Sequence, residues 1–297
     1  MKLELEPGVY VAAVSGGVDS VVLLHILKDL PGVELVVAHF DHGIRQESAQ
    51  DRQFVEELAH KYGLPFEYAE GKLGAHASEE TARRSRYEFL HQVMQLHNAR
   101  AIVTAHHQDD VLETAILNLL RGTGRKGLTS LENRQHIIRP LLHMSKQVIR
   151  DYARQHNLQW QEDVTNQDPK YLRNYIRLNI VPNLGDAAKQ KLQSIIEGSR
   201  QLNAELDLAI EGLLPEGDTF RRQDFIMLPH SLACEVMASW LRRHGIAEFN
   251  RKTIERLVVA AKVGGPNTAV DIYGTNQLRI NQDSVIIHSS KHSQTPG

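Results

Sequence analysis

Four short apolar runs alternate with segments of helical periodicity in the first part of the chain. The runs are residues 9–14, 34–38, 66–69 and 101–105, and the helices predicted after the first three are 20–30, 47–62 and 79–97. Such alternation is typical of successive βα units, which build a parallel sheet. The sequence therefore predicts an α/β fold with a doubly wound, mostly parallel, Rossmann-like sheet. Ligands of such folds bind beyond the carboxyl ends of the strands.

The pattern changes to helices near Asp186. The helices predicted there are 187–214, 232–244 and 252–261, followed by strands at 268–273 and 284–288 that flank a turn region. A chain of 297 residues exceeds one average domain. We therefore expect a sheet domain over 1–185 and a smaller, mainly helical domain over 186–297 that ends in a β-hairpin.

The composition is that of an ordinary soluble globular protein, with 41% hydrophobic and 24% charged residues. No apolar run is long enough to span a membrane, and the start, MKLELEPGVY, lacks the regions of a signal peptide. We therefore expect a cytoplasmic protein with no membrane partner. The one cysteine, Cys234, excludes an intrachain disulfide framework, a cysteine-based zinc cluster and sulfur transfer between two thiols. The net charge of −2 gives no overall attraction to nucleic acid, so such a partner would need local basic patches.

A glycine-rich turn, SGGVDS at residues 15–20, joins the first apolar run to the first predicted helix. A strand, a tight turn and a helix N-terminus together present backbone N–H groups and the positive end of the helix dipole to an anion. Gly16 and Gly17 allow a positive φ and close approach of the main chain, and Ser15 and Ser20 add hydroxyl donors. The turn matches neither the Walker nor the dinucleotide pattern. It predicts a phosphate loop of another kind, and the alternative is a helix start that binds no ligand.

Two histidines and an aspartate, His39, Asp41 and His42, follow the second predicted strand. Their residue types are those of metal ligands, and a metallo-phosphoesterase would use such a cluster. The same segment could instead contact a nucleotide base or ribose, or be a structural loop. The residues alone leave these three interpretations open.

Three arginines lie within four positions of the third predicted helix. Arg83, Arg86 and Tyr87 share one face at i, i+3 and i+4, whereas Arg84 points elsewhere. Guanidinium groups in this arrangement suit phosphate or carboxylate recognition. The alternative is a solvated basic face.

The helix predicted after the fourth strand carries carboxylates in its first turns. Asp110, Glu113 and Thr114 lie opposite the stripe that is predicted to face the core. That stripe consists of Leu112, Ala115, Ile116 and Leu119. Two carboxylates one turn apart can bind Mg²⁺ or an ammonium group. Their position near the phosphate loop favours this over an acidic turn that only offsets the helix dipole.

Two further segments are rich in basic residues. The stretch RGTGRKG at 121–127 includes Arg125 and Lys126 and predicts a mobile positive loop suited to a polyanion, or else a plain helix C-cap followed by a surface loop. The run YLRNYIR at 171–177 includes Arg173 and Arg177. Its composition suits contacts with phosphates and bases, although tyrosines at such spacing are often core residues.

These segments, in this order, resemble the tRNA(Ile)-lysidine synthetase family of the N-type ATP pyrophosphatases, the PP-loop superfamily. The resemblance rests on SGGVDS, AHFDHGIR, ARRSRY, AHHQDDVLET, LLRGTGRKGL, RPLL and EDVTNQDPKYLRNYIR. It is strong over about residues 9–182 and weaker in the helical part that follows.

The resemblance implies a two-step reaction on the wobble cytidine of tRNA(Ile) with a CAU anticodon. ATP first adenylates the C2 oxygen of the base and releases pyrophosphate. The ε-amino group of free L-lysine then attacks C2 and expels AMP, which leaves lysidine and changes codon reading from AUG to AUA. The implied ligands are ATP, Mg²⁺, L-lysine and tRNA(Ile), and a homodimer is the default oligomer.

The resemblance also implies roles for particular residues. The implied ATP site is Ser15, Gly16, Gly17, Val18, Asp19, Ser20, His39 and Arg84, with Asp19 also as the Mg²⁺ ligand. The implied catalytic residues are Asp19, Arg86, Asp110 and Glu113, and the implied substrate contacts are Asp110, Glu113, Arg125, Lys126, Arg173 and Arg177. His106 is expected near adenosine or cytosine. The two carboxylates would hold the lysine cation and help remove its proton.

Three other functions fit parts of the sequence. A tRNA thiolase of the same superfamily shares the loop but needs paired cysteines or a cluster to deliver sulfur, and the chain has Cys234 alone. A metal-dependent phosphoesterase would not need the loop and would use a two-metal site made of His39, Asp41, His42, His106, Asp109 and Asp110. An ATP-responsive RNA-binding module would bind ATP without releasing pyrophosphate.

Overall fold

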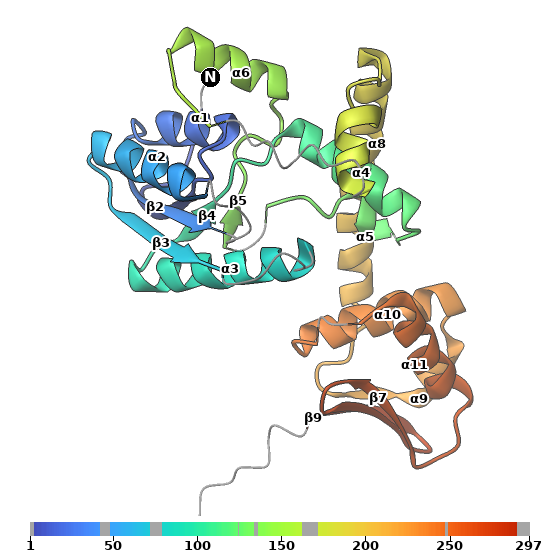
Figure 1. Ribbon diagram of the computed structural model, residues 1–297. Coiled ribbons are helices and arrows are strands. Elements are labelled where there is room, and N and C mark those ends of the chain that lie inside the picture. The colour runs from blue at the N-terminus through green and yellow to red at the C-terminus, as the bar shows by residue number, and fades with distance from the viewer. Residues whose placement is uncertain are drawn as a thin grey trace, which may run out of the picture. The chain divides into compact units, whose positions relative to one another are not determined.

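The computed structural model describes residues 3–41, 48–71, 79–123, 125–133, 136–161, 172–246 and 249–289. The chain forms two compact units, Met1–Arg200 and Gln201–Gly297 (Figure 1). The boundary between them falls inside the long helix α8 (Asp186–Glu211), whose first residue is where the sequence predicts the second domain to begin. Within the described ranges, no helix is both long and apolar enough to cross a membrane.

The first unit is built on a five-stranded parallel sheet with the strand order β3-β2-β1-β4-β5. The strands are β1 (Gly8–Ala13), β2 (Val33–Asp41), β3 (Phe66–Glu70), β4 (Ala101–Val103) and β5 (Ile137–Ile138). In the central register, Val11 lies opposite both Val36 and Ile102. The predicted doubly wound parallel sheet is confirmed.

Helices follow each of the first four strands. They are α1 (Val18–Leu27), α2 (Ser48–Lys61), α3 (Glu79–Leu96) and α4 (Gln108–Leu120), and the short α5 (Arg125–Leu128) comes before β5. After β5 come α6 (Lys146–Gln155), α7 (Leu172–Tyr175) and the π-helical turn η2 (Ile176–Ile180). The first three helices lie where the sequence predicts them.

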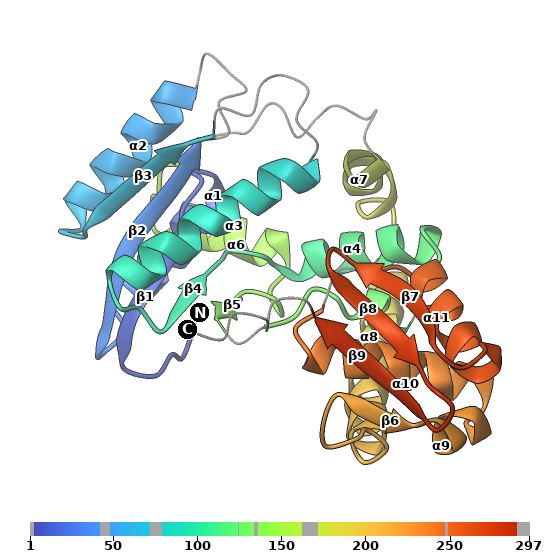
Figure 2. The same cartoon turned by 90° about the horizontal axis from the view of Figure 1, so that it is seen from below.

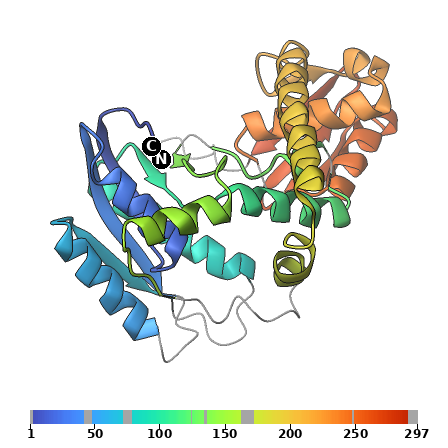
Figure 3. The same cartoon turned by 90° about the horizontal axis from the view of Figure 1, so that it is seen from above.

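Alternate residues of the central strands serve two separate cores. Ala12 and Val37 belong to a cluster with residues of α1, α2 and α6, whereas Val11, Val36 and Ile102 belong to one with α3. Figure 2 shows α3 crossing one face of the sheet, and Figure 3 shows α1 and α6 on the other. Because both faces are covered, the strands read in the sequence as continuous apolar runs.

The strand order reverses between β1 and β4. From β1 the chain builds outward to β2 and β3, and then returns to place β4 on the other side of β1. Such a switch point opens a crevice beyond the carboxyl ends of the two strands, and ligands of doubly wound folds bind there. The 15–20 turn follows β1 and the 104–110 segment follows β4, so both predicted motifs lie at this switch point.

Helix α4 is covered by other elements on the face that the sequence predicts to lie opposite the core. Leu112 packs with Ile176 of η2 in a third core cluster, but the predicted core residue Leu119 is 63% exposed. Glu113 and Thr114, predicted to lie on an open polar face, are buried instead. The predicted orientation of α4 is therefore wrong in part. The cause is that α7 and η2, which come from far along the sequence, pack against the side of α4 that bears these polar residues.

The second unit combines helices with a four-stranded antiparallel sheet of order β6-β9-β8-β7. Its elements after α8 are β6 (Thr219–Arg221), α9 (Arg222–Met227), α10 (His230–Arg243), α11 (Arg251–Val263), β7 (Thr268–Tyr273), β8 (Asn276–Ile280) and β9 (Ser284–Ser289). Trp240 and Phe225 are fully buried in its core. The predicted hairpin of 268–273 with 284–288 is wrong, because β8 lies between these strands and pairs with both.

Candidate active site

The phosphate-loop candidate, residues 15–20, is held by its own serine side chains. Ser20 Oγ accepts a hydrogen bond from Ser15 N at 3.2 Å and donates one to Gly17 O at 2.9 Å. Ser15 Oγ lies 3.3 Å from Ser20 Oγ and accepts from Gly17 N at 3.4 Å. The two hydroxyls, which the sequence suggests as donors to a ligand, thus stabilise the turn itself.

The two glycines of the loop have different backbone conformations. Gly16 has φ of +93°, which L side chains rarely adopt, so the turn requires glycine there. Gly17 is the N-cap of α1 with φ of −71°, and the predicted positive φ is wrong for this residue. The N–H groups of Val18 and Asp19 have no partner inside α1, because the first turn of a helix has no preceding carbonyls to bond. These groups and the helix dipole make the turn suitable for an anion.

This contrast gives a stability prediction. Gly16→Ala is expected to lower the free energy of unfolding by about 1–2 kcal/mol, because alanine pays the cost of left-handed backbone. Gly17→Ala, whose Cβ would meet only Ser15 Oγ at 3.6 Å, is expected to change it by less than about 0.5 kcal/mol. Urea unfolding of both variants measures the difference. Equal losses would contradict the assignment of the strained angle to Gly16.

Asp19 and His107 join the carboxyl ends of β1 and β4. Asp19 Oδ2 lies 3.5 Å from His107 Nε2, and the same nitrogen lies 3.5 Å from Asp110 Oδ2. His107 is buried. The backbone N–H of His107 also donates a hydrogen bond to Asp110 Oδ2 at 2.9 Å. Asp19 Oδ1 is buried and has no hydrogen-bond partner among the described residues. One oxygen of Asp19 is therefore fixed by the histidine and the other is available to a ligand.

Asp19, His107 and Asp110 each stabilise the charged form of their neighbours. Burial lowers the pKa of His107, but the hydrogen bond with Asp19 and the charges of Asp110 and Asp19 outweigh it, so the net pKa lies above the ordinary value. Burial raises the pKa of Asp110, but the charge of His107, the hydrogen bond from the His107 backbone and the charge of Arg177 outweigh it and hold the pKa below its ordinary value. The two carboxylates thus stabilise the protonated form of His107 relative to an isolated histidine.

A salt bridge occupies the predicted carboxylate pair on α4. Arg177 Nε and Nη2 donate to the two oxygens of Glu113, each at 2.8 Å, and Nη2 lies 3.4 Å from Asp110 Oδ1. Burial raises the pKa of Glu113 more than the salt bridge lowers it. Nearby, Arg173 Nη2 donates to Thr114 Oγ1 at 3.1 Å. The structure brings Asp110, Glu113 and Arg177 together, a contact that the sequence analysis does not anticipate.

The predicted shared face of Arg83, Arg86 and Tyr87 on α3 is confirmed. Arg83 Nη2 donates to the Tyr87 hydroxyl at 3.4 Å, and the guanidinium carbons of Arg83 and Arg86 lie 4.9 and 5.3 Å from the centroid of the Tyr87 ring. Arg84 is exposed and lies 3.8 Å from Glu88, so the structure does not bring it to this face. Arg86 Nε is buried without a hydrogen-bond partner among the described residues.

Arg139 completes this basic group and is missed by the sequence analysis as a site residue. It follows β5 directly, is 3% exposed, donates to the Glu132 carbonyl and lowers the pKa of Tyr87 through a hydrogen bond and its charge. The available signal is the RPLL motif, whose arginine sits at the carboxyl end of a strand. A strand as short as Ile137–Ile138 is not visible as a run of its own, so the motif could not be placed.

His39 is fixed inside the sheet. Its Nδ1 lies 2.8 Å from the Val14 carbonyl, and its ring stacks on Tyr68 at 6.1 Å and 10°. Burial lowers its pKa, which keeps the ring neutral near pH 7. No group of three potential metal-ligating residues comes together in the part of the chain that the structure describes. His42, the third member of the suggested metal cluster, lies outside that part.

The segment predicted as a positive loop is helical in part, because Arg125 and Lys126 lie on the helical turn α5. Asn118 of α4 fastens this turn by donating to Gly127 O at 2.8 Å and to Ser130 Oγ at 2.9 Å. Gly124 and the segment 162–171 lie outside the described residues. The two basic residues are thus presented on an ordered turn attached to the end of α4.

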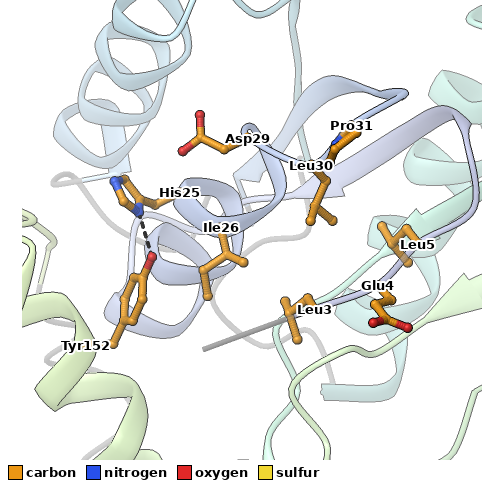
Figure 4. Close-up of a pocket in the computed structure, with 9 residues that line it drawn as sticks. All are labelled: Leu3, Glu4, Leu5, His25, Ile26, Asp29, Leu30, Pro31 and Tyr152. Carbon is orange, nitrogen blue, oxygen red and sulfur yellow. Dashed lines mark hydrogen bonds between the residues drawn. The ribbon is translucent and has the colours of Figure 1, made fainter.

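Two hollows lie in the first unit, one beside the phosphate loop and one at α1. One, of about 430 Å³, is lined by Phe54, Trp160 and their neighbours, and adjoins the phosphate loop, because Gln161 N donates to Gly16 O at 2.9 Å. The other, of about 390 Å³, lies at the far end of α1, where Tyr152 and His25 are 3.2 Å apart (Figure 4). It contains none of the predicted site residues, so the switch-point crevice is the better candidate site.

Comparisons with known proteins agree with this arrangement. The chain is 38% identical over 273 residues to the tRNA(Ile)-lysidine synthase of Thermus thermophilus, covering 87% of this chain and 53% of that protein. It is 41% identical over 189 residues to that of Thermotoga maritima, with 60% and 46% covered, and 32% identical over 266 residues to that of Lactiplantibacillus plantarum, with 84% and 59% covered. The chain therefore spans about half the length of the curated relatives it matches.

A solved structure and a family model identify the fold. The U34-tRNA thiolase NcsA from Methanococcus maripaludis, determined with its [4Fe-4S] cluster, superposes with a TM-score of 0.55 at 18% identity and covers 67% of this chain and 73% of its own, which is a likeness of fold. Residues 4–184 match the family model of the PP-loop domain, a range that covers the sheet, the 15–20 turn and α4. The chain belongs to the PP-loop domain family.

Proposed function

We propose that this protein ligates L-lysine to C2 of the wobble cytidine of tRNA(Ile) with a CAU anticodon, using ATP, and so forms lysidine. The observation that carries the proposal is the set of Asp19, His107 and Asp110, which links a PP-loop to an acidic helix at the switch point of the sheet. The relatives named above support the choice of substrate.

In the first step, the cytidine C2 oxygen attacks the α-phosphorus of ATP and pyrophosphate leaves. The N–H groups of the first turn of α1 bind the phosphates, and the hollow beside Gly16 offers the flat apolar walls of Phe54 and Trp160 to adenine. Asp19 Oδ1, which has no hydrogen-bond partner in the described part of the chain, suits Mg²⁺, which binds through one or two carboxylates together with substrate phosphates. When bound, the ion offsets the charge that develops on the leaving group. Arg86 adds a fixed positive charge on the side from which the RNA approaches.

In the second step, the ε-amine of lysine attacks C2, the C2–O bond breaks and AMP leaves. Asp110 and Glu113 hold the incoming cation, and they form this site by exchanging part of their contact with Arg177. Because burial holds the pKa of Glu113 above its ordinary value, this carboxylate suits the acceptance of the proton that the amine loses. We place the reaction in the cytoplasm. We also expect the protein to be a homodimer, and sedimentation analysis measures its oligomeric state.

The test is pyrophosphate release from ATP with a tRNA(Ile) transcript, with and without lysine, followed by nucleoside analysis. The proposal expects release that depends on the RNA, and lysidine only when lysine is present. Release without RNA, or ATP binding without any release, would reject it. A thiolase reaction is not favoured, since the chain has Cys234 alone, on α10 of the second unit.

The role of Glu113 predicts a specific defect. Glu113→Gln is expected to raise the lysine concentration for half-maximal lysidine formation about tenfold, because a charge-assisted hydrogen bond to the ammonium group is lost. The effect on lysine requirement should exceed the effect on pyrophosphate release. Glu197→Gln, an exposed carboxylate on α8, is the matched control. If Glu113→Gln formed lysidine as fast as the wild type at limiting lysine, the assignment of Glu113 to the lysine site would be wrong.

The basic turn α5 predicts a change in salt dependence. Replacing Arg125 and Lys126 by glutamine is expected to weaken tRNA binding and to reduce the slope of log K against log salt by about one to two. Filter binding over a series of salt concentrations measures this slope. Arg154→Gln on α6, an exposed position, is the control, and an unchanged slope in the double variant would contradict tRNA contact at α5.

A further inference from the structure

We propose that Arg83, Arg86, Tyr87 and Arg139 form a second anion site, separate from the phosphate loop, that binds a backbone phosphodiester of the RNA substrate. The cluster of these four residues is called the arginine site below. The phosphodiester as ligand rests on the proposed function, which supplies the RNA.

The arginine site brings three guanidinium groups around one phenol. Arg83 and Arg86 approach the Tyr87 ring to 4.9 and 5.3 Å, and Arg83 also donates to the hydroxyl at 3.4 Å. Arg139 reaches the same phenol from the end of β5. Although burial raises the pKa of Tyr87, the three arginines outweigh it and lower the pKa. The site is therefore a region of strong positive potential.

An unmet hydrogen-bond donor points to a ligand at this site. Arg86 Nε is buried and has no partner among the described residues, and an unpaired buried donor on a charged group is costly. Burial, with the charges of Arg83 and Arg173, lowers the pKa of Arg86. An anion would satisfy the donor and offset the repulsion among the arginines, and the planar guanidinium fork matches phosphate.

The phosphate loop adjoins His107, and the charges of the arginine site act on the preceding residue, His106. His106 and His107 are consecutive residues between β4 and α4, and different groups lie near each of them. His107 contacts Asp19 of the loop. Burial is the largest cause that lowers the pKa of His106 to about 3. The charge of Asp110 opposes this shift in part, and the charges of Arg86, Arg139 and Arg83 add to it. His106 is thus neutral and faces the arginines.

This arrangement favours RNA over pyrophosphate as the source of the anion. The triphosphate has its own donors at the start of α1, on the His107 side. A nucleotide whose base reaches the α-phosphate from the His106 side brings its flanking phosphodiesters with it. Phosphate contacts of this kind fix the register of a nucleic acid and leave the base free to react.

The test uses tRNA(Ile) transcripts in which one phosphodiester near the reactive cytidine at a time is replaced by a neutral methylphosphonate. Filter binding to the full chain is expected to show one linkage whose replacement weakens wild-type binding about tenfold. Arg83→Gln should bind unmodified RNA about tenfold less tightly and lose nothing further at that linkage, which is the mark of a direct contact. Tyr87→Phe, which removes one hydroxyl, should show the same coupling more weakly.

Arg150→Gln is the matched control, since it removes an equal charge from an exposed position on α6 and should keep the full methylphosphonate penalty. The proposal is overturned if Arg83→Gln keeps that penalty at every linkage, or if the wild type binds no RNA. It is also overturned if Arg83→Gln instead makes the reaction less sensitive to inhibition by added pyrophosphate. Binding requires no turnover. Pyrophosphate release by the wild type with unmodified tRNA therefore reports separately on the proposed function.

Discussion

Asp19→Asn is expected to lower RNA-dependent pyrophosphate release by about a hundredfold to a thousandfold, the range seen when one fixed electrostatic contact to developing charge is removed. Asp19 Oδ1 is buried and unpartnered among the described residues, while Oδ2 lies 3.5 Å from the buried His107. Asparagine keeps the shape but removes the charge that suits Mg²⁺ and pairs with the imidazolium. A coupled pyrophosphate assay at saturating ATP and RNA measures the loss.

Asp29→Asn is the control for this experiment. Asp29 lies just beyond the other end of the same helix, 68% exposed and 2.6 Å from Lys28, and it has no place in the switch-point crevice. Release by Asp29→Asn should equal that of the wild type. If Asp19→Asn retained more than about a tenth of wild-type release, Asp19 would not be the residue that serves the phosphates.

Arg177→Met is expected to lower the free energy of unfolding by about 2–3 kcal/mol at neutral pH. This loss is smaller than that of a fully buried ion pair, because the Arg177 side chain is 27% exposed. The loss arises because Glu113, only 3% exposed, keeps its charge without the two 2.8 Å hydrogen bonds. The double variant Arg177→Met/Glu113→Gln should recover most of the loss. Urea unfolding of the single and double variants measures the coupling.

The loss in Arg177→Met has a defined pH dependence. Burial already holds the pKa of Glu113 above its ordinary value of 4.5, and removal of the neighbouring cation raises it further. A carboxyl whose pKa is higher in the folded state binds more protons when folded, so stability falls as pH rises through that range. The variant should therefore approach the wild type as pH falls from neutral towards 4.5, and a deficit that grew on acidification would contradict the account.

The local parts of the fold and site could be predicted from the sequence. The apolar runs of β1 and β2 are continuous because both faces of the sheet are covered, so their pattern is clear. The glycine at position 16 signals a turn that only local backbone geometry decides, and its φ of +93° confirms that signal. The shared face of Arg83, Arg86 and Tyr87 follows from helical spacing alone.

Features that depend on distant segments could not be predicted. The burial of Glu113 comes from Arg177, 64 positions later, which no periodicity within α4 reveals. Strand β8 was missed because only Leu278 and Ile280 of its five residues enter the core. The roles that the resemblance gives to Arg84, Asp110 and Glu113 stay predictions, and for Arg84 the exposed contact with Glu88 supplies no support.

The central claim is that the 15–20 turn holds the phosphates of ATP at the switch point of the sheet. A crystal structure with Mg²⁺ and a non-hydrolysable ATP analogue tests it most directly. The account predicts the triphosphate within hydrogen-bond distance of the N–H groups of Val18 and Asp19, with the metal on Asp19 Oδ1. A nucleotide bound elsewhere, with this turn empty, would contradict the claim.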